Sequence, residues 1–252
     1  MDKKTLKSLQ SLKLKKYRYD HEKFLIEGKR LVQAAVEHEH PINEIYCTKA
    51  FLNKNRGWAV LDAIPIENIN ILTENDLKKI SSTVSPSGVC AVCKIKPREL
   101  INFNQAKWVY LDKIKDPGNL GAILRSAAWF NLRNIAISPE CVDVYNPKVI
   151  RSAMGSQFAL TIHRDIELDT FQETHTIIAS SLKGEKLEGF KFPDRFVLVF
   201  SNEAHGLSQS RKNSVNSFVN ITKSGSGESL NVSNAASIIM YATSQFSLRG
   251  ST

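Results

Sequence analysis

The chain has 252 residues, of which 42% are hydrophobic and 23% charged, and its formal net charge at pH 7 is +9. This composition is typical of a folded globular protein, and the length allows one or two domains. No apolar run reaches the roughly 18 to 20 residues that span a bilayer, and the first residues lack the apolar centre of a secretion signal. We therefore expect a cytoplasmic protein without a membrane partner.

Positive charge is concentrated at the start of the chain. Residues 1–30 contain ten Lys or Arg and four Asp or Glu, a net charge of +6. Tyr17, Tyr19 and Phe24 are interleaved with these cations, and aromatic faces beside positive charges suit the unstacked bases and phosphates of RNA. A solvated helix face or an anionic lipid surface would also explain a basic tract, but the aromatic residues favour RNA.

Alternating helix and strand patterns follow this basic start. Apolar residues at helical spacing predict a helix over 24–38, and residues 42–48 are typical of a short strand. Residues 69–83 predict a strand and then a helix with Thr73 as its N-cap, and 88–95 predicts another strand. The polar stretch 96–105 breaks the pattern. We expect a small α/β domain over 1–96 and a linker over 97–105.

The alternation restarts in the expected second domain, 106–252. Residues 108–112 predict a strand, 119–130 a helix and 134–138 another strand. Further strands are predicted at 158–163, 176–181, 196–200 and 218–221, followed by an apolar helix over 230–246. Strands separated by helices favour a mainly parallel sheet, whose ligands usually bind beyond the carboxyl ends of the strands.

The four cysteines include one C-x-x-C pair, Cys90 and Cys93. Small apolar residues alternate around this pair, which favours a buried strand. A second Cys or His pair at zinc spacing is missing. Two reduced core thiols are therefore favoured over a metal or redox site, and no metal ligands are expected.

Two polar clusters follow predicted strands. In the first, a turn at 116–118 precedes Asn119, which can cap the next helix, and Arg125 lies about 9 Å further along that helix. As an alternative, a capped helix with one surface arginine would explain Asn119. It would not explain the concentration of turn-forming residues at 116–118. In the second, the strand 197–200 leads into Ser201, Asn202 and Glu203. Glu203 would, as an alternative, cap the following short helix.

A third polar cluster contains Ser229, Asn231, Ser233 and Asn234 and runs directly into the last apolar helix. No Walker loop and no complete G-x-G-x-x-G precedes a helix anywhere in the chain. The sequence therefore supports neither nucleotide hydrolysis nor a Rossmann dinucleotide site, and these polar groups need another ligand.

Together the three clusters resemble the motifs of the SpoU-type branch of the SPOUT RNA methyltransferases. The matching segments are "LDKIKDPGNLGAILRSAAWF", "FSNEAHGLS" and "ESLNVSNAASI", in family order, with "NPKVIRSAMGSQF" between the first two. The resemblance implies transfer of a methyl group from S-adenosylmethionine to a ribose 2′-hydroxyl of RNA. It also implies a C-terminal SPOUT domain with a trefoil knot, an exception to the rule that chains do not thread loops.

The resemblance also implies which residues form the site. The catalytic set is Asn119, Arg125, Glu203, Ser229 and Asn231, and the cofactor contacts are Ser201, Ile221 and Leu230, through their backbone groups. The sequence departs from the family pattern at Ser201 and Ala204, where glycine is usual, and at Thr222, where proline is common. Both replacements of glycine are small and leave room for a ligand near the backbone.

Partners and domain roles follow from the same resemblance. The basic N-terminal domain resembles the ribosomal-protein-like substrate-binding domain of two-domain relatives, and these relatives usually form homodimers. Because such a domain can hold a structured RNA, ribosomal RNA is favoured over transfer RNA. A non-catalytic RNA-binding or assembly protein on the same fold is the competing hypothesis, with only Ser201 and Ala204 in its favour.

Overall fold

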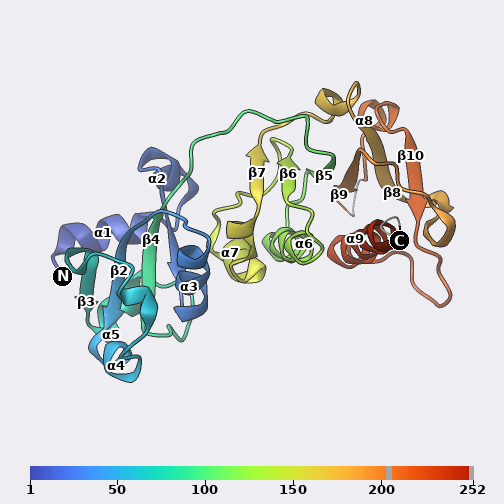
Figure 1. Ribbon diagram of the computed structural model, residues 1–252. Coiled ribbons are helices and arrows are strands. Elements are labelled where there is room, and N and C mark those ends of the chain that lie inside the picture. Colours follow the sequence, from blue (N-terminus) through green and yellow to red (C-terminus); the bar gives the residue numbers. More distant parts are fainter. Residues whose placement is uncertain (203–205, 250–252) are drawn as a thin grey trace. The chain divides into compact units, whose positions relative to one another are not determined.

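The computed structural model describes residues 1–202 and 206–249, and the chain divides into two compact units (Figure 1). Unit 1 contains Met1–Pro97 together with Asp143–Phe158, and unit 2 contains Arg98–Val142 and Ala159–Thr252. The expected division placed residues 143–158 with the C-terminal half of the chain. They pack instead with the N-terminal unit, while the functional roles of the two domains stay a prediction.

Unit 1 is built on a four-stranded mixed sheet in the order β1-β4-β2-β3. Strand β4 pairs antiparallel with β1 and β2, and β2 pairs parallel with β3. The elements of this unit are α1 (Lys3–Ser11), α2 (Lys15–Asp20), β1 (Lys23–Glu27), α3 (Lys29–Glu37), β2 (Ile42–Thr48), α4 (Lys49–Lys54), β3 (Ile69–Leu72), α5 (Glu74–Ile80), β4 (Val89–Lys94) and α7 (Pro147–Ala153).

The predicted helix over 24–38 is wrong in its first part, because residues 23–27 form strand β1. Phe24 and Ile26 face one core cluster and Leu25 faces another, so both sides of the strand are apolar and the alternation of a half-buried strand is hidden. Gly28, with φ of 100°, separates this strand from helix α3. By contrast, Thr73 caps α5 as predicted by accepting a hydrogen bond from the backbone N–H of Asp76.

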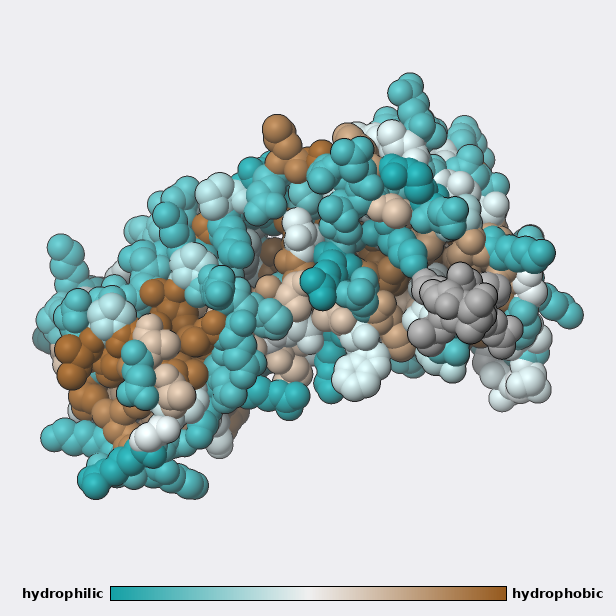
Figure 2. Space-filling view, in the orientation of Figure 1, coloured by the Kyte–Doolittle hydropathy of each residue, from teal (hydrophilic) through white to brown (hydrophobic). Residues whose placement is uncertain are grey.

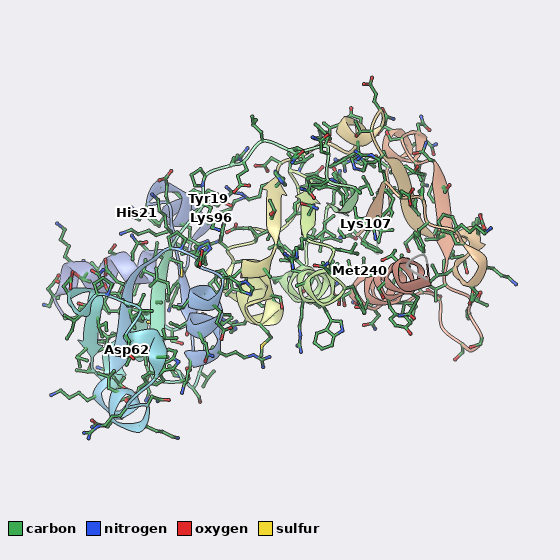
Figure 3. All side chains as sticks on the ribbon, in the orientation of Figure 1. Tyr19, His21, Asp62, Lys96, Lys107 and Met240 are labelled. Atoms are coloured by element: carbon green, nitrogen blue, oxygen red, sulfur yellow. The ribbon has the colours of Figure 1, made fainter. Side chains whose placement is uncertain are left out.

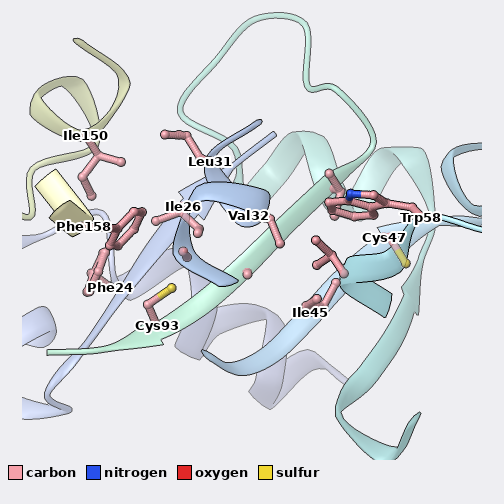
Figure 4. Close-up of a cluster of buried hydrophobic side chains, with 14 of the residues drawn as sticks. Phe24, Ile26, Leu31, Val32, Ile45, Cys47, Trp58, Cys93, Ile150 and Phe158 are labelled. Carbon is pink, nitrogen blue, oxygen red and sulfur yellow. The ribbon is translucent and has the colours of Figure 1, made fainter. Parts of the chain in front are cut away.

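A large apolar cluster lies on one face of the unit 1 sheet (Figure 4). Ile150 and Phe158 of the segment 143–158 are members of this cluster, which explains why the segment belongs to unit 1. Cys93 lies in the same cluster, whereas Cys90 lies in the cluster on the opposite face of β4. The two thiols of the C-x-x-C pair are therefore buried on opposite sides of one strand.

Unit 2 contains a six-stranded sheet in the order β10-β8-β9-β5-β6-β7, in which each described pairing is parallel. This confirms the predicted α/β class and the parallel sheet, and the trefoil knot stays a prediction. The elements are β5 (Lys107–Asp112), α6 (Pro117–Trp129), β6 (Asn134–Ile137), β7 (Thr161–Arg164), β8 (Thr176–Lys186), β9 (Phe196–Ser201), α8 (Gln209–Asn213), β10 (Ser217–Asn220) and α9 (Val232–Arg249).

Helices α6 and α9 lie side by side in unit 2 (Figure 1). Their contact includes a hydrogen bond of 2.7 Å between the hydroxyls of Ser126 and Ser237, and the rings of Phe130 and Tyr241 lie 6.0 Å apart. Met240 of α9 is fully buried (Figure 3). Among the helices that the structure describes, none combines the length and hydropathy that a membrane crossing requires.

Candidate active site

The carboxyl ends of β5 and β9 lie next to each other in the unit 2 sheet. Asp112, the last residue of β5, is in register with Ser201, the last residue of β9. The first and second polar clusters leave the sheet at these two points. This edge of a parallel sheet is where loops most often build a ligand site, as the sequence predicted.

The first cluster forms the start of helix α6. Asp116, rather than the predicted Asn119, caps the helix, because its Oδ1 accepts a hydrogen bond of 2.8 Å from the backbone N–H of Asn119. Pro117 occupies the first turn, where it needs no hydrogen-bond donor. Asn119 is therefore a residue of the first helical turn and not the cap. Arg125 is exposed further along α6 and has no hydrogen bond or ion pair to any residue that the structure describes.

The third cluster meets the first through Asn231. Its Nδ2 donates a hydrogen bond of 3.0 Å to Oδ1 of Asn119, 112 positions away in the sequence. Its Oδ1 accepts hydrogen bonds from the backbone N–H of Ser233 at 2.9 Å and from the hydroxyl of Ser233 at 2.6 Å. Asn231 thus caps α9 and at the same time connects it to α6, which explains part of the polar crowding before this apolar helix.

The second cluster is described on both sides of residues 203–205. The backbone N–H of Asn202 donates to the carbonyl of Asp112 at 3.1 Å, and the N–H of Gly206 donates to the carbonyl of Asn202 at 2.9 Å. Ser208 caps the short helix α8. Capping this helix was the alternative role considered for Glu203. Glu203 itself, predicted as catalytic, and Ala204 lie outside the described residues.

A cavity of about 550 Å³ lies beside the second and third clusters. All three predicted cofactor contacts, Ser201, Ile221 and Leu230, line it, and so does the predicted catalytic Ser229. Asn119, Arg125 and Asn231 are not among its lining residues. Of the predicted residues, Ser201, Ile221, Ser229 and Leu230 therefore share the cavity wall. Asn119 and Asn231 meet at the starts of two helices, and the structure places Arg125 in neither group.

Sequence reasoning missed part of this cavity wall. Ser180, Ser181 and Leu182 line the cavity, and they lie where the register between β8 and β10 shifts from Ala179–Phe218 to Glu185–Val219. Gly184 makes this bulge possible, because a Cβ there would lie 2.5 Å from the backbone of Phe218. The two serines after an apolar run were the only sign of it in the sequence. Lys212 of α8 also lines the cavity.

A charged group is buried under this edge of the sheet. The Asp112 carboxylate is 1% exposed and accepts a hydrogen bond from Nη1 of Arg211. Nη2 of Arg211 donates to Oε2 of Glu167 at 3.1 Å. Burial raises the pKa of the Asp112 carboxyl, and the charge of Arg211 opposes that rise. Within the described part of the chain, no three His, Cys, Asp or Glu side chains are grouped as a metal site would need.

Comparisons with known proteins match both units. The sequence model of the SpoU rRNA Methylase family matches residues 106–241, and that of the MRM3-like substrate binding domain matches residues 3–91. The chain is 28% identical over 243 residues to the 23S rRNA (guanosine(2553)-2′-O)-methyltransferase RlmP of Bacillus subtilis, covering 94% of each protein. It is 29% identical to the 23S rRNA (uridine(2479)-2′-O)-methyltransferase of Streptomyces viridochromogenes, covering 91% of this chain and 85% of that protein.

Solved structures show the same architecture. A crystal structure of an RNA 2′-O ribose methyltransferase is 25% identical and superposes with a TM-score of 0.84, covering 98% of this chain and 97% of that one. The SpoU methyltransferase AviRb of Streptomyces viridochromogenes, crystallised with AdoMet, is 24% identical, with a TM-score of 0.85 over 98% of this chain and 99% of that one. At 24% identity, the similarity to AviRb shows a shared fold.

Proposed function

Because the chain belongs to the SpoU rRNA methylase family, we infer that it methylates a ribose 2′-hydroxyl of RNA with S-adenosylmethionine as the methyl donor. The observation that carries this inference is the meeting of three motifs at one edge of the unit 2 sheet, with Asn119 bonded to Asn231 and Ser201 lining the neighbouring cavity. We favour ribosomal RNA as the substrate, since two relatives that match more than nine tenths of this chain are named as 23S rRNA methyltransferases.

The cavity suits the cofactor. Its volume of about 550 Å³ lies within the usual range for small-ligand sites. Apolar side chains such as Phe200 and Leu207 line it together with serines and the backbone of the stretch 221–230, a mixture that fits a nucleoside bearing an amino-acid tail. Ser201, Ile221 and Leu230 would hold this group through their backbone. When bound, S-adenosylmethionine supplies an electrophilic methyl group.

The remaining predicted residues would act on the RNA. A guanidinium stays protonated at neutral pH and is therefore a poor base, so we assign Arg125 to binding a phosphate and stabilising developing negative charge. Its exposure and its lack of partners among the described residues suit this role. Ser229 and Asn231 would orient the ribose, so that positioning supplies much of the rate. We assign Glu203 to ordering the second motif.

The experiment is methyl transfer from labelled cofactor to undermethylated ribosomal RNA, with the protein and an Arg125→Ala variant. We expect the variant to lose about 10²- to 10³-fold in kcat while RNA affinity and cofactor affinity stay close to those of the wild type. Absence of labelled RNA with the wild-type protein would favour a non-catalytic RNA-binding protein. Label found only in transfer RNA would correct the substrate and leave the chemistry intact.

Unit 1 is proposed to hold the RNA substrate. The match of residues 3–91 to a substrate-binding domain supports this role, as do the exposed lysines of its first two helices. In Figure 2, hydrophilic side chains surround an exposed hydrophobic patch on this unit. The lysines concerned are Lys3, Lys4, Lys7, Lys15 and Lys16.

The aromatic part of the RNA prediction needs correction. Phe24 is 1% exposed and packs against Tyr145, and the hydroxyl of Tyr19 donates to Asp143 at 2.8 Å (Figure 3). Both side chains hold the segment 143–158 in unit 1. Tyr17, which is exposed and stacked on His21, is the one aromatic side chain of the three that faces solvent.

We also propose that the protein is a cytoplasmic homodimer. Support comes from the paired helices α6 and α9, where Trp129 is 83% exposed and Tyr241 and Ile238 are also exposed. Large apolar side chains on neighbouring helices suit a second copy of this chain. Light scattering at micromolar concentration should give twice the single-chain mass of 28.3 kDa, and the single-chain value would contradict the dimer.

A further inference from the structure

Two residues on either side of positions 203–205, Asn202 and Arg211, are attached to one residue, Asp112. Where the chain leaves β9, the backbone N–H of Asn202 donates to the Asp112 carbonyl at 3.1 Å, and Nδ2 of Asn202 donates to the carbonyl of Lys113 at 3.4 Å. Where the chain enters α8, Arg211 donates from its guanidinium to the Asp112 carboxylate. The end of β5 thus fixes one residue within the second motif, Asn202, and one residue shortly after it, Arg211.

Arg211 is suited to this attachment. Its side chain is only 14% exposed, and its guanidinium bridges Asp112 of β5 and Glu167, which precedes a short helical turn at Leu168–Phe171. A planar guanidinium can donate to two carboxylates in fixed directions, which an ammonium group cannot do. Oδ2 of Asp112 is buried without a partner among the described residues, so loss of Arg211 would leave a buried carboxylate unpaired.

The attached residues are also part of the cavity wall. Ser201, Asn202, Gly206 and Leu207 line the cavity, and Lys212, which follows Arg211 directly, lines it as well. A shift of α8 away from the end of β5 would move Lys212 and Leu207 together. The position of this wall therefore depends on the contact between Arg211 and Asp112.

We propose that Asp112 and Arg211 are positioning residues for the cofactor cavity, which hold the described lining residues around Asn202 and Lys212 in place without touching the ligand. This proposal rests on the function inferred above, because it takes S-adenosylmethionine as the ligand of the cavity. It adds two residues that belong to none of the predicted catalytic or cofactor sets. Loss of either contact should weaken cofactor binding before it affects RNA binding.

The test measures cofactor affinity by calorimetry, and the KM for S-adenosylmethionine, with the full-length chain carrying Arg211→Gln. We expect about a tenfold or greater loss of affinity and a matching rise in this KM, with RNA affinity unchanged. Arg98→Gln is the matched control, because it removes the exposed ion pair of Arg98 with Asp165 in the same unit and should change neither value. Asp112→Asn should weaken binding similarly, and the double variant should lose little more than either single variant.

Arg211→Lys keeps the positive charge but lacks the planar guanidinium that donates to two carboxylates. It should bind S-adenosylmethionine with an affinity between those of the wild type and the glutamine variant, and it can be measured if the glutamine variant does not fold. Folded variants that bind the cofactor within twofold of wild type would overturn the proposal. So would a loss of affinity that only matches the unfolded fraction measured by circular dichroism. A wild-type chain that does not bind S-adenosylmethionine would instead contradict the proposed function, so the two failures are distinguishable.

Discussion

Arginines in the two units of this protein are used in opposite ways. Arg18 of unit 1 is 2% exposed and donates to Asp143 at 2.5 and 2.9 Å and to the carbonyls of Leu12 and Lys13. Arg125 of unit 2 is exposed and has no partner among the described residues. Both residues lie in segments for which the sequence predicted contact with RNA. The donors of Arg18, however, are hydrogen-bonded to other groups of the protein. Both residues carry the same charge. What distinguishes them is that the guanidinium of Arg125 has donors left for a ligand, whereas the guanidinium of Arg18 stabilises the fold.

The largest expected loss of stability comes from Asp143→Ala, which removes the buried carboxylate partner of Arg18. It leaves Arg18 buried without its carboxylate and removes one acceptor of the Tyr19 hydroxyl, which should lower the free energy of unfolding of unit 1 by about 3 to 5 kcal/mol. Urea denaturation, with hydrogen exchange to localise the loss to residues 15–37, measures this. The control is Arg98→Ala, which removes an exposed ion pair with Asp165 and is expected to cost less than about 1 kcal/mol. Equal losses in both variants would contradict the comparison.

A second prediction concerns lysines that, unlike Arg18, are exposed. Replacing Lys7, Lys15 and Lys16 with Ala should weaken RNA binding about tenfold and lower the slope of log affinity against log salt by up to about 2, because phosphate contacts are lost. Cofactor affinity should not change.

The matched control replaces three other exposed lysines of unit 1, Lys49, Lys54 and Lys78, which lie on α4 and α5. This triple variant has the same net charge as the first. If both triple variants lose the same RNA affinity, net charge explains binding and the assignment of the surface to α1 and α2 is wrong.

The smallest predicted effect is the pH dependence of unit 1. His40 packs between the rings of Phe24 and Phe158, and burial lowers its pKa to about 4. A pKa below the unfolded value of 6.5 means that the unfolded chain binds the proton more readily, so stability is lost as pH falls from about 6.5 toward 4. At pH 5 we expect a loss of roughly 1 to 2 kcal/mol.

Hydrogen exchange of unit 1 peptides at pH 7 and pH 5 checks this value. His40→Gln should remove most of the pH dependence, whereas the same change at the exposed His38 should leave it intact. An unaltered pH dependence in the His40 variant would assign the effect to other groups.

Features that depend on neighbouring residues were predicted well from the sequence. Features that depend on contacts between distant residues were not. The parallel sheet of unit 2, the cap at Thr73 and the polar cavity residues Ser201 and Ser229 depend on neighbouring residues or on where a strand ends. The role of Arg18 depends on Asp143, 125 positions away, and no sequence pattern connects them.

Two other differences have equally physical causes. Strand β1 was missed because apolar residues cover both of its faces, which removes the alternation that identifies a half-buried strand. Asn119 was taken as the helix cap because Asp116 and Asn119 are both good capping residues, and only the geometry shows which one accepts the hydrogen bond.

The segment 143–158 constrains the order in which the protein folds during synthesis. When residue 97 has been made, the apolar cluster of unit 1 still lacks Ile150 and Phe158, and Arg18 still lacks its carboxylate. These groups arrive about 60 residues later, which at roughly 5 to 20 residues per second is a delay of about 3 to 12 seconds. During that interval the N-terminal part of the nascent chain has an incomplete core, so we expect the apolar residues that Ile150 and Phe158 later cover to be accessible to chaperones.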